Sequence, residues 1–282
     1  DLGVYDVVGL VGEFADRASL IALNGASFGC QLSLGGNDTT QKRVQAVQDE
    51  IRNFHQVFGQ YKFITLPEVT KEDVVYLASK GVKTSIRFPM KAFKIADAVT
   101  SIGLYHAVMG SYPAAADAAT LARWQANPDL PLTYTTLTED QAFAAKLSKL
   151  TGRHFFIPDS AQVEYAIRGR TQNGQGAITT TVYHFGDDEN EVKDRAWTHS
   201  NSGNQPHGVH EALPGHTLED SKNSFGLIHP IGNVWVRSSD GVVRGGAFDR
   251  NEWLAESSNS YDGYADGRSD DFASRLAELR HD

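Results

Sequence analysis

Apolar residues recur at helical spacing along residues 39–59 of the chain. They lie three or four residues apart, and they are Val44, Val47, Ile51, Phe54 and Phe58. This spacing places apolar side chains on one face of an α-helix, which can then pack against a core. The segment is therefore predicted to be an amphipathic helix.

Capping residues predict three further helices. Each begins at a Thr or Asp whose side chain can accept a hydrogen bond from a free backbone N–H, and each ends at a Gly. The predicted pairs of first and last residue are Thr70 and Gly81, Thr138 and Gly152, and Asp159 and Gly169. Residues 84–110 are predicted to form a strand followed by a helix.

Helical patterning fades after residue 170, where Gly, Asn, Ser and Asp become frequent. Short apolar stretches favour strands in TTTVYHF, NVWVRS and GVVRGGAF. Short strands are also predicted within residues 1–35, with turns at Asn24-Gly25 and Gly35-Gly36. The predicted class is an α+β protein with a loop-rich C-terminal half.

Composition and charge narrow the classes of function. The 282 residues carry a formal net charge of −9, which disfavours nucleic acid and anionic membranes as partners because both attract a basic face. No apolar run approaches the length of a membrane span. The chain begins at Asp1 rather than Met, which leaves room for a removed signal peptide or a lipid anchor.

Six blocks of the sequence resemble the formylglycine-generating (sulfatase-modifying) family, in the family's order. They are LIALNGASFGCQLS, KAFKIADAVTSIGLYHAV, GRHFFIPDSAQVEYAIRG, NSFGLIHPIGNVW, VVRGGAFDRNEW and ADGRSDDFASRLA. The resemblance implies one C-type-lectin-like domain of the formylglycine-generating type over residues 1–282. Residues 36–84 would then be a helical insertion that the family core lacks.

The fold hosts several functions, so it does not decide this one. The family's oxidases bind copper through two nearby thiols shortly after the Gly-Gly of the VVRGG block, because thiolates select Cu(I). Here that stretch contains no cysteine, and the whole chain has one, Cys30. The protein is therefore predicted not to be such an enzyme.

No cofactor is expected either. In the family a glutamate follows the tryptophan of GNVW and helps to bind calcium, which needs six to eight oxygen ligands. Val236 occupies that position here, although Asn233 remains as a candidate oxygen ligand.

The segment HEALPGH offers the alternative of a metal-dependent hydrolase using His210, Glu211 and His216. In zinc proteases the two histidines are four residues apart on one helical face. Here they are six apart, roughly 240° around a helix, and Pro214 would break that helix. The segment is predicted to be a loop. An enzyme related to the formylglycine-generating type remains the other alternative.

The composition of residues 245–275 favours ligand binding. Residues 245–275 mix aromatic rings with short polar side chains, as antibody binding surfaces do. The candidate ligand-binding residues are Phe248, Asp249, Arg250, Asn251, Trp253, Ser257, Ser258, Asn259, Tyr261, Asp262, Tyr264, Asp266 and Ser269. Ordinary loops of this fold have a similar composition, which is the structural alternative.

The resemblance extends to the variable proteins of diversity-generating retroelements, which display such a surface on this fold. Their diversification replaces adenines, largely in Asn codons, and yields the residue types that dominate this stretch. Trp cannot be produced in that way, so Trp253 would be a fixed residue. The predicted function is non-catalytic binding of a protein or cell-surface receptor by an extracellular, bacterial-surface or phage-surface protein.

Other residues are predicted to have structural roles. Trp235 and Tyr165 are expected in the core. Arg244 and Arg275 are expected to hold loops through charge-assisted hydrogen bonds. Asp270 and Asp271 are each expected either to pair with Arg268 or to be solvated.

Overall fold

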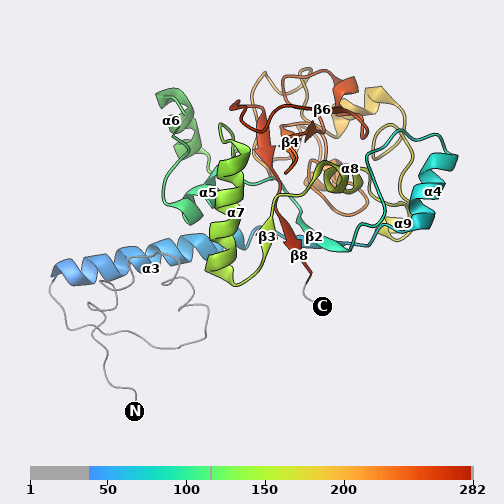
Figure 1. Ribbon diagram of the computed structural model, residues 1–282. Helices are drawn as coiled ribbons and strands as arrows, with labels where there is room; N and C mark the ends of the chain where they lie inside the picture. The colour runs from blue at the N-terminus through green and yellow to red at the C-terminus, as the bar shows by residue number, and fades with distance from the viewer. Residues whose placement is uncertain (1–37, 115, 281–282) are drawn as a thin grey trace, which may run out of the picture.

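The computed structural model describes residues 38–114 and 116–280 (Figure 1). Three expectations lie outside these residues: the strands and turns within residues 1–36, the surroundings of Cys30, and the first block that resembles the family. Within the described part of the chain, no helix is both long and apolar enough to cross a membrane.

Helices occupy mainly the first two thirds of the described chain. The α-helices are α3 (Asp38–Phe58), α4 (Lys71–Ser79), α5 (Ile102–Met109), α6 (Ala118–Ala126), α7 (Leu137–Thr151), α8 (Ser160–Arg168) and α9 (Thr171–Gly174). Short 3-10 helices follow as η1 (Glu189–Asp194), η2 (Leu218–Ser221) and η3 (Glu252–Ala255).

Short strands form two four-stranded sheets. The first has the order β1 (Phe63–Leu66), β2 (Phe93–Ala96), β8 (Ala277–Leu279) and β3 (Phe155–Phe156), and all its neighbours are antiparallel. The second has the order β6 (Ser260–Tyr261), β5 (Val243–Arg244), β4 (Trp235–Arg237) and β7 (Phe272–Ser274). Its β4–β7 pair is parallel. With its loop-rich C-terminal half, the structure confirms the predicted α+β class.

The capping signals located most helices. Helix α4 begins after a capping box of Thr70 and Asp73, and α8 begins after Asp159, as predicted. Helix α7 instead begins after Thr136, whose side chain accepts a hydrogen bond from the Glu139 N–H. The prediction of Thr138 as its cap was therefore wrong by two residues. Glu139 provides the reciprocal hydrogen bond that a capping box requires.

Other elements depart from the predictions. TTTVYHF forms no strand and contributes only the isolated pairing of Tyr183 with Gly186. The Val182 N–H donates to the Asp187 carboxylate, so the backbone closes a local turn. Helix α6 and strand β1 were not predicted.

Residues 36–84, predicted as a helical insertion, contain α3 and α4 as expected but also β1, which pairs with β2 over four residues. The segment is therefore part of the first sheet. In Figure 1 helix α3 extends from one side of the body and α4 lies at the opposite side. That the segment is an insertion, and that residues 1–282 form one domain, stay predictions.

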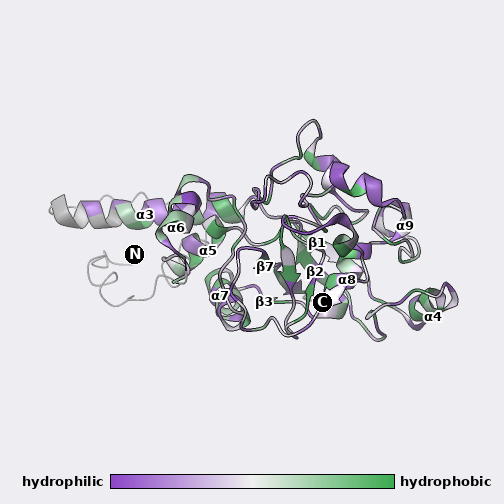
Figure 2. Ribbon diagram, turned by 90° about the horizontal axis from the view of Figure 1, so that it is seen from above, coloured by the Kyte–Doolittle hydropathy of each residue, from purple (hydrophilic) through white to green (hydrophobic). Residues whose placement is uncertain are grey.

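The core predictions hold. Trp235 and Tyr165 are buried, with 3% and 0% of their surface exposed. Figure 2 shows hydrophobic residues on the strands at the centre of the body, whereas helix α4 at its edge alternates hydrophilic and hydrophobic residues. The guanidinium of Arg275 is fully enclosed and donates to the backbone carbonyls of Ala96, Asp97, Ile228 and His229.

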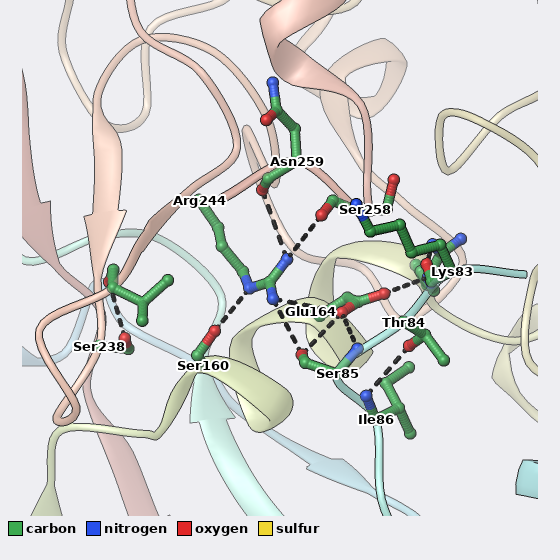
Figure 3. A network of polar contacts seen from close by, with 12 residues as sticks. Lys83, Thr84, Ser85, Ile86, Ser160, Glu164, Ser238, Arg244, Ser258 and Asn259 are labelled. Atoms are coloured by element: carbon green, nitrogen blue, oxygen red, sulfur yellow. Dashed lines mark hydrogen bonds and ion pairs between the residues drawn. The ribbon is translucent and has the colours of Figure 1, made fainter. Parts of the chain in front are cut away.

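Arg244 ties the second sheet to the rest of the molecule (Figure 3). Its guanidinium donates to the Ser160 and Ser85 hydroxyls at 2.8 and 2.9 Å and lies 3.4 Å from the Glu164 carboxylate. It also donates to the carbonyls of Ser258 and Asn259. A buried charge is tolerated only when it is paired and hydrogen-bonded in this way. The network fixes the backbone just before β6.

Candidate functional site

A hollow of about 250 Å³ lies on one face of the second sheet. We name it the C-terminal hollow. Its lining residues are Trp235, Val243, Arg250, Leu254, Tyr261, Tyr264 and Phe272. Six of the seven are apolar or aromatic, and Arg250 is the charged one.

Strand register brings these distant residues onto one face. Trp235 of β4 lies beside Phe272 of β7, and Val243 of β5 lies opposite Tyr261 of β6. Val243 is also opposite Arg237, which is two residues from Trp235 and so shares its face of the sheet. Side chains that are neighbours across paired strands contact one another, which builds the floor of the hollow.

The loop after β6 forms the rim of the hollow, and main-chain hydrogen bonds hold it in place. Gly263, at φ 90°, permits the turn between Tyr261 and Tyr264. The Tyr264 N–H donates to the Gly241 carbonyl. Further along, the Leu137 and Tyr134 N–H groups donate to carbonyls of residues 265 and 269. The loop is therefore anchored at both ends.

Two edge-to-face aromatic pairs shape the walls. The rings of Trp235 and Tyr261 have centroids 5.4 Å apart at 83°, and those of Tyr264 and Phe272 are 4.9 Å apart at 72°. Such pairs are favourable beyond their buried area. They fix the position of each ring relative to its partner.

Arg250 lies between two carboxylates. Its Nη2 donates to Asp271 Oδ2 at 3.0 Å, and its Nη1 lies 3.3 Å from Asp249 Oδ2. Burial and the negative charge of Asp271 together raise the pKa of Asp249. Asp271 is itself buried and pairs with Arg250, so the prediction that it pairs with Arg268 or is solvated was wrong. Arg268 instead binds Glu139.

The predicted ligand-binding residues fall into four groups. Arg250, Tyr261 and Tyr264 line the hollow. Four others are exposed, namely Asn251, Trp253, Asp262 and Asp266, and four are partly buried, namely Asp249, Ser258, Asn259 and Ser269. Phe248 and Ser257 are buried, with 3% and 0% of their surface exposed. These two belong to the interior, so their expected place on the surface was wrong.

Sequence reasoning missed Trp235, Val243, Leu254 and Phe272 as residues of the hollow. Trp235 was assigned to the core, and it is buried while one side borders the hollow. The alternation of NVWVRS places Trp235 and Arg237 on one face, which is the one signal in the sequence for this set. Leu254 in η3 and Phe272 in β7 carry none, and the position of Phe272 is set by the pairing of β7 with the distant strand β4.

The HEALPGH segment forms a loop, as predicted, and its side chains have separate partners. His210 Nδ1 lies 2.7 Å from Asp129 Oδ1, and Glu211 binds His207 and the Gly208 N–H. His216 lies 3.8 Å from Asp194. Among the described residues, no three His, Cys, Asp or Glu side chains are grouped as a metal site requires.

The calcium position of the family does not fit the ion either. Both ends of the Asn233 amide bind the His207 backbone, at 2.9 Å each. Val236 is a buried apolar side chain with no oxygen to offer. Copper held by two thiols also does not fit a chain that has a single cysteine.

Comparison with solved structures shows the same fold in other proteins. Treponema denticola variable protein 1 matches at TM-score 0.57 and 19% identity, covering 78% of this chain and 95% of that chain. PvdO from Pseudomonas aeruginosa matches at 0.51 and 17%, covering 78% and 91%. CarF matches at 0.55 and 14%, covering 78% and 98%.

The family of this chain is identified by the match of its sequence to a family model. No curated protein matches the chain. The family model described as "Sulfatase-modifying factor enzyme 1-like domain" matches residues 29–278, which is most of its length. The chain therefore belongs to the sulfatase-modifying factor enzyme 1-like family, with the C-type-lectin-like fold of the formylglycine-generating type.

Proposed function

We propose that this protein is a non-catalytic binding protein that presents the C-terminal hollow and its rim to a ligand. The observation that carries the proposal is the hollow itself. Three residues that composition alone marked for binding, Arg250, Tyr261 and Tyr264, line it together. Large apolar walls with few polar groups are typical of ligand sites.

The scaffold beneath the hollow supports this function. The Arg244 network holds the backbone just before β6, and the backbone bonds to residues 134 and 137 hold the rim after it. A pre-organised surface loses less conformational entropy when it binds, which raises affinity. Exposed residues of the rim can vary without disturbing these contacts, because the contacts are made by main-chain atoms.

The proposed binding mode is that of the retroelement variable proteins. Treponema denticola variable protein 1 has this fold. The proposed partner is a protein or cell-surface receptor, and the proposed location is extracellular or on a bacterial or phage surface. Binding of this kind needs no cofactor.

The genomic neighbourhood tests the retroelement origin. We expect a reverse transcriptase gene nearby, together with a near-copy of the DNA encoding residues 245–275 that differs only at adenines. A neighbourhood of sulfatase or biosynthetic genes without such a copy would contradict the proposal.

Variants test the binding surface directly. A partner selected against the full chain should bind at least about tenfold more weakly to Tyr261→Ala and Tyr264→Ala, since Tyr residues are frequent hot spots. Tyr76→Ala, a change on the distant helix α4, should bind normally. Equal binding by all three variants would exclude the hollow as the contact.

A further inference from the structure

The segment that supplies Arg250, Leu254, Tyr261 and Tyr264 to the C-terminal hollow is strongly acidic. Residues 249–271 contain seven acidic and two basic residues, so they carry −5 of the chain's net charge of −9. One of the two basic residues, Arg268, is held by both oxygens of Glu139 at 2.6 and 2.9 Å. The field at this surface therefore attracts cations and repels anions.

The two carboxylates that pair with Arg250 of the hollow also lack hydrogen-bond donors. Asp271 is 2% exposed, and its Oδ1 has no partner although its Oδ2 accepts from Arg250. Asp249 Oδ1 is likewise buried without a partner. Buried carboxylate oxygens without donors are costly. Two carboxylates share one guanidinium here, so acceptors outnumber donors.

The walls favour a particular kind of cation. The aromatic rings of Trp235, Tyr261 and Tyr264 have π-systems that attract positive charge, and the ring of Phe272 already has the Arg237 guanidinium 5.6 Å from its centroid. Val243 and Leu254 add apolar surface that can cover an aliphatic stem. A guanidinium matches these surroundings better than an ammonium does. It is planar, stacks on aromatic rings, is weakly hydrated and donates several N–H groups to carboxylates.

We propose that the C-terminal hollow receives an arginine side chain of a protein partner. This inference rests on the proposed binding function and specifies its chemistry. The arginine supplies positive charge to the acidic segment 249–271 that borders the hollow. Arg250 does not oppose it, because Asp249 and Asp271 on either side of Arg250 leave the trio with an excess of negative charge.

Four capped pentapeptides of the form Gly-Gly-X-Gly-Gly test the proposal, where X is Arg, citrulline, Lys or Glu. Citrulline keeps the shape of arginine without its charge. Binding is followed on the full chain by the indole N–H signals of its four tryptophans, assigned through Trp→Phe variants. The arginine peptide should shift the signal of Trp235, which lines the hollow, and leave that of Trp124 unchanged.

The expected order of affinity follows from charge and shape. The citrulline peptide should bind about tenfold more weakly than the arginine peptide. The lysine peptide should fall between them, and the glutamate peptide should not bind. Asp249→Asn and Tyr264→Ala should weaken arginine binding, whereas Glu72→Gln, the same loss of charge on α4, should not.

Several results would overturn the proposal. These are equal binding of the arginine and citrulline peptides, tighter binding of the lysine or glutamate peptide, or an equal effect of Glu72→Gln and Asp249→Asn. If no arginine peptide binds but a selected partner still requires Tyr261 and Tyr264, the chemistry is wrong and the binding function stands. If the selected partner is indifferent to both tyrosines, the binding function itself fails.

Discussion

At the scale of single residues, neighbours in the C-terminal segment have opposite roles. Phe248 is 3% exposed and its N–H donates to the Asn233 carbonyl, whereas Tyr261 is 38% exposed at the hollow. Composition marked both for binding because aromatic residues serve in cores and in binding surfaces alike. Only the structure separates them.

This difference predicts unlike effects on stability. Phe248→Ala should lower the free energy of unfolding by about 3–5 kcal/mol, because it opens a cavity. Tyr261→Ala should change it by less than about 1 kcal/mol, since much of the ring is already solvated. Urea unfolding measures both. Similar losses for the two variants would show that Tyr261 supports the fold instead of the surface.

Two buried histidines predict a dependence of stability on pH. Burial lowers the pKa of His184 to about 3 and that of His229 to about 4. Both bind a proton near the ordinary value of 6.5 when the chain unfolds, so acid favours the unfolded state. Their contribution is complete above about pH 6.5 and is lost as the pH falls toward 4, at about 1.4 kcal/mol per pH unit for each.

Urea unfolding at about pH 7.5 and about pH 5.5 measures this loss. His229→Gln should reduce the difference between the two pH values, and His154→Gln, a change at an exposed histidine, should leave it unaltered. Stability that is the same at both pH values would contradict the burial of these rings.

At the scale of elements, local signals located the helices better than the strands. Caps such as Thr70 and Asp159 depend only on residues close to them in the chain, so a sequence shows them directly. Strand β1 has four residues and exists through its pairing with β2, some thirty residues later. Helix α6 had a usable signal in Asp117, whose side chain accepts from the Thr120 N–H.

The corrected start of α7 gives a direct test. Thr136→Ala should lower the free energy of unfolding by about 1 kcal/mol, the usual value of an N-cap. Thr138→Ala, two residues into the helix, should have little effect or stabilise slightly, because Ala favours helices. Thermal unfolding of the two variants distinguishes the observed cap from the one expected from the sequence, and a reversed order would contradict it.

The candidate site was predictable only in the part that depends on local sequence. Arg250, Tyr261 and Tyr264 stand in one segment whose composition indicated binding. Trp235 and Phe272 join them through the parallel pairing of β4 with β7, which no local pattern specifies. A sequence therefore shows the rim of such a hollow more readily than its floor.

At the scale of the whole molecule, family membership does not determine function. The family model and the solved structures agree on the fold, and the fold serves proteins of different kinds. The single cysteine removes the oxidase's thiol pair. The described part of this chain has an aromatic hollow on its second sheet, next to an acidic segment.

The most direct test of the central claim is deep sequencing of the codons for residues 245–275 across a population of the source organism. A diversified binding surface predicts variation at the exposed or lining positions Arg250, Asn251, Tyr261 and Tyr264. Buried Phe248 and Ser257, and Trp253, which adenine replacement cannot produce, should be constant. Uniform codons throughout, or variation at the buried positions instead, would contradict the account.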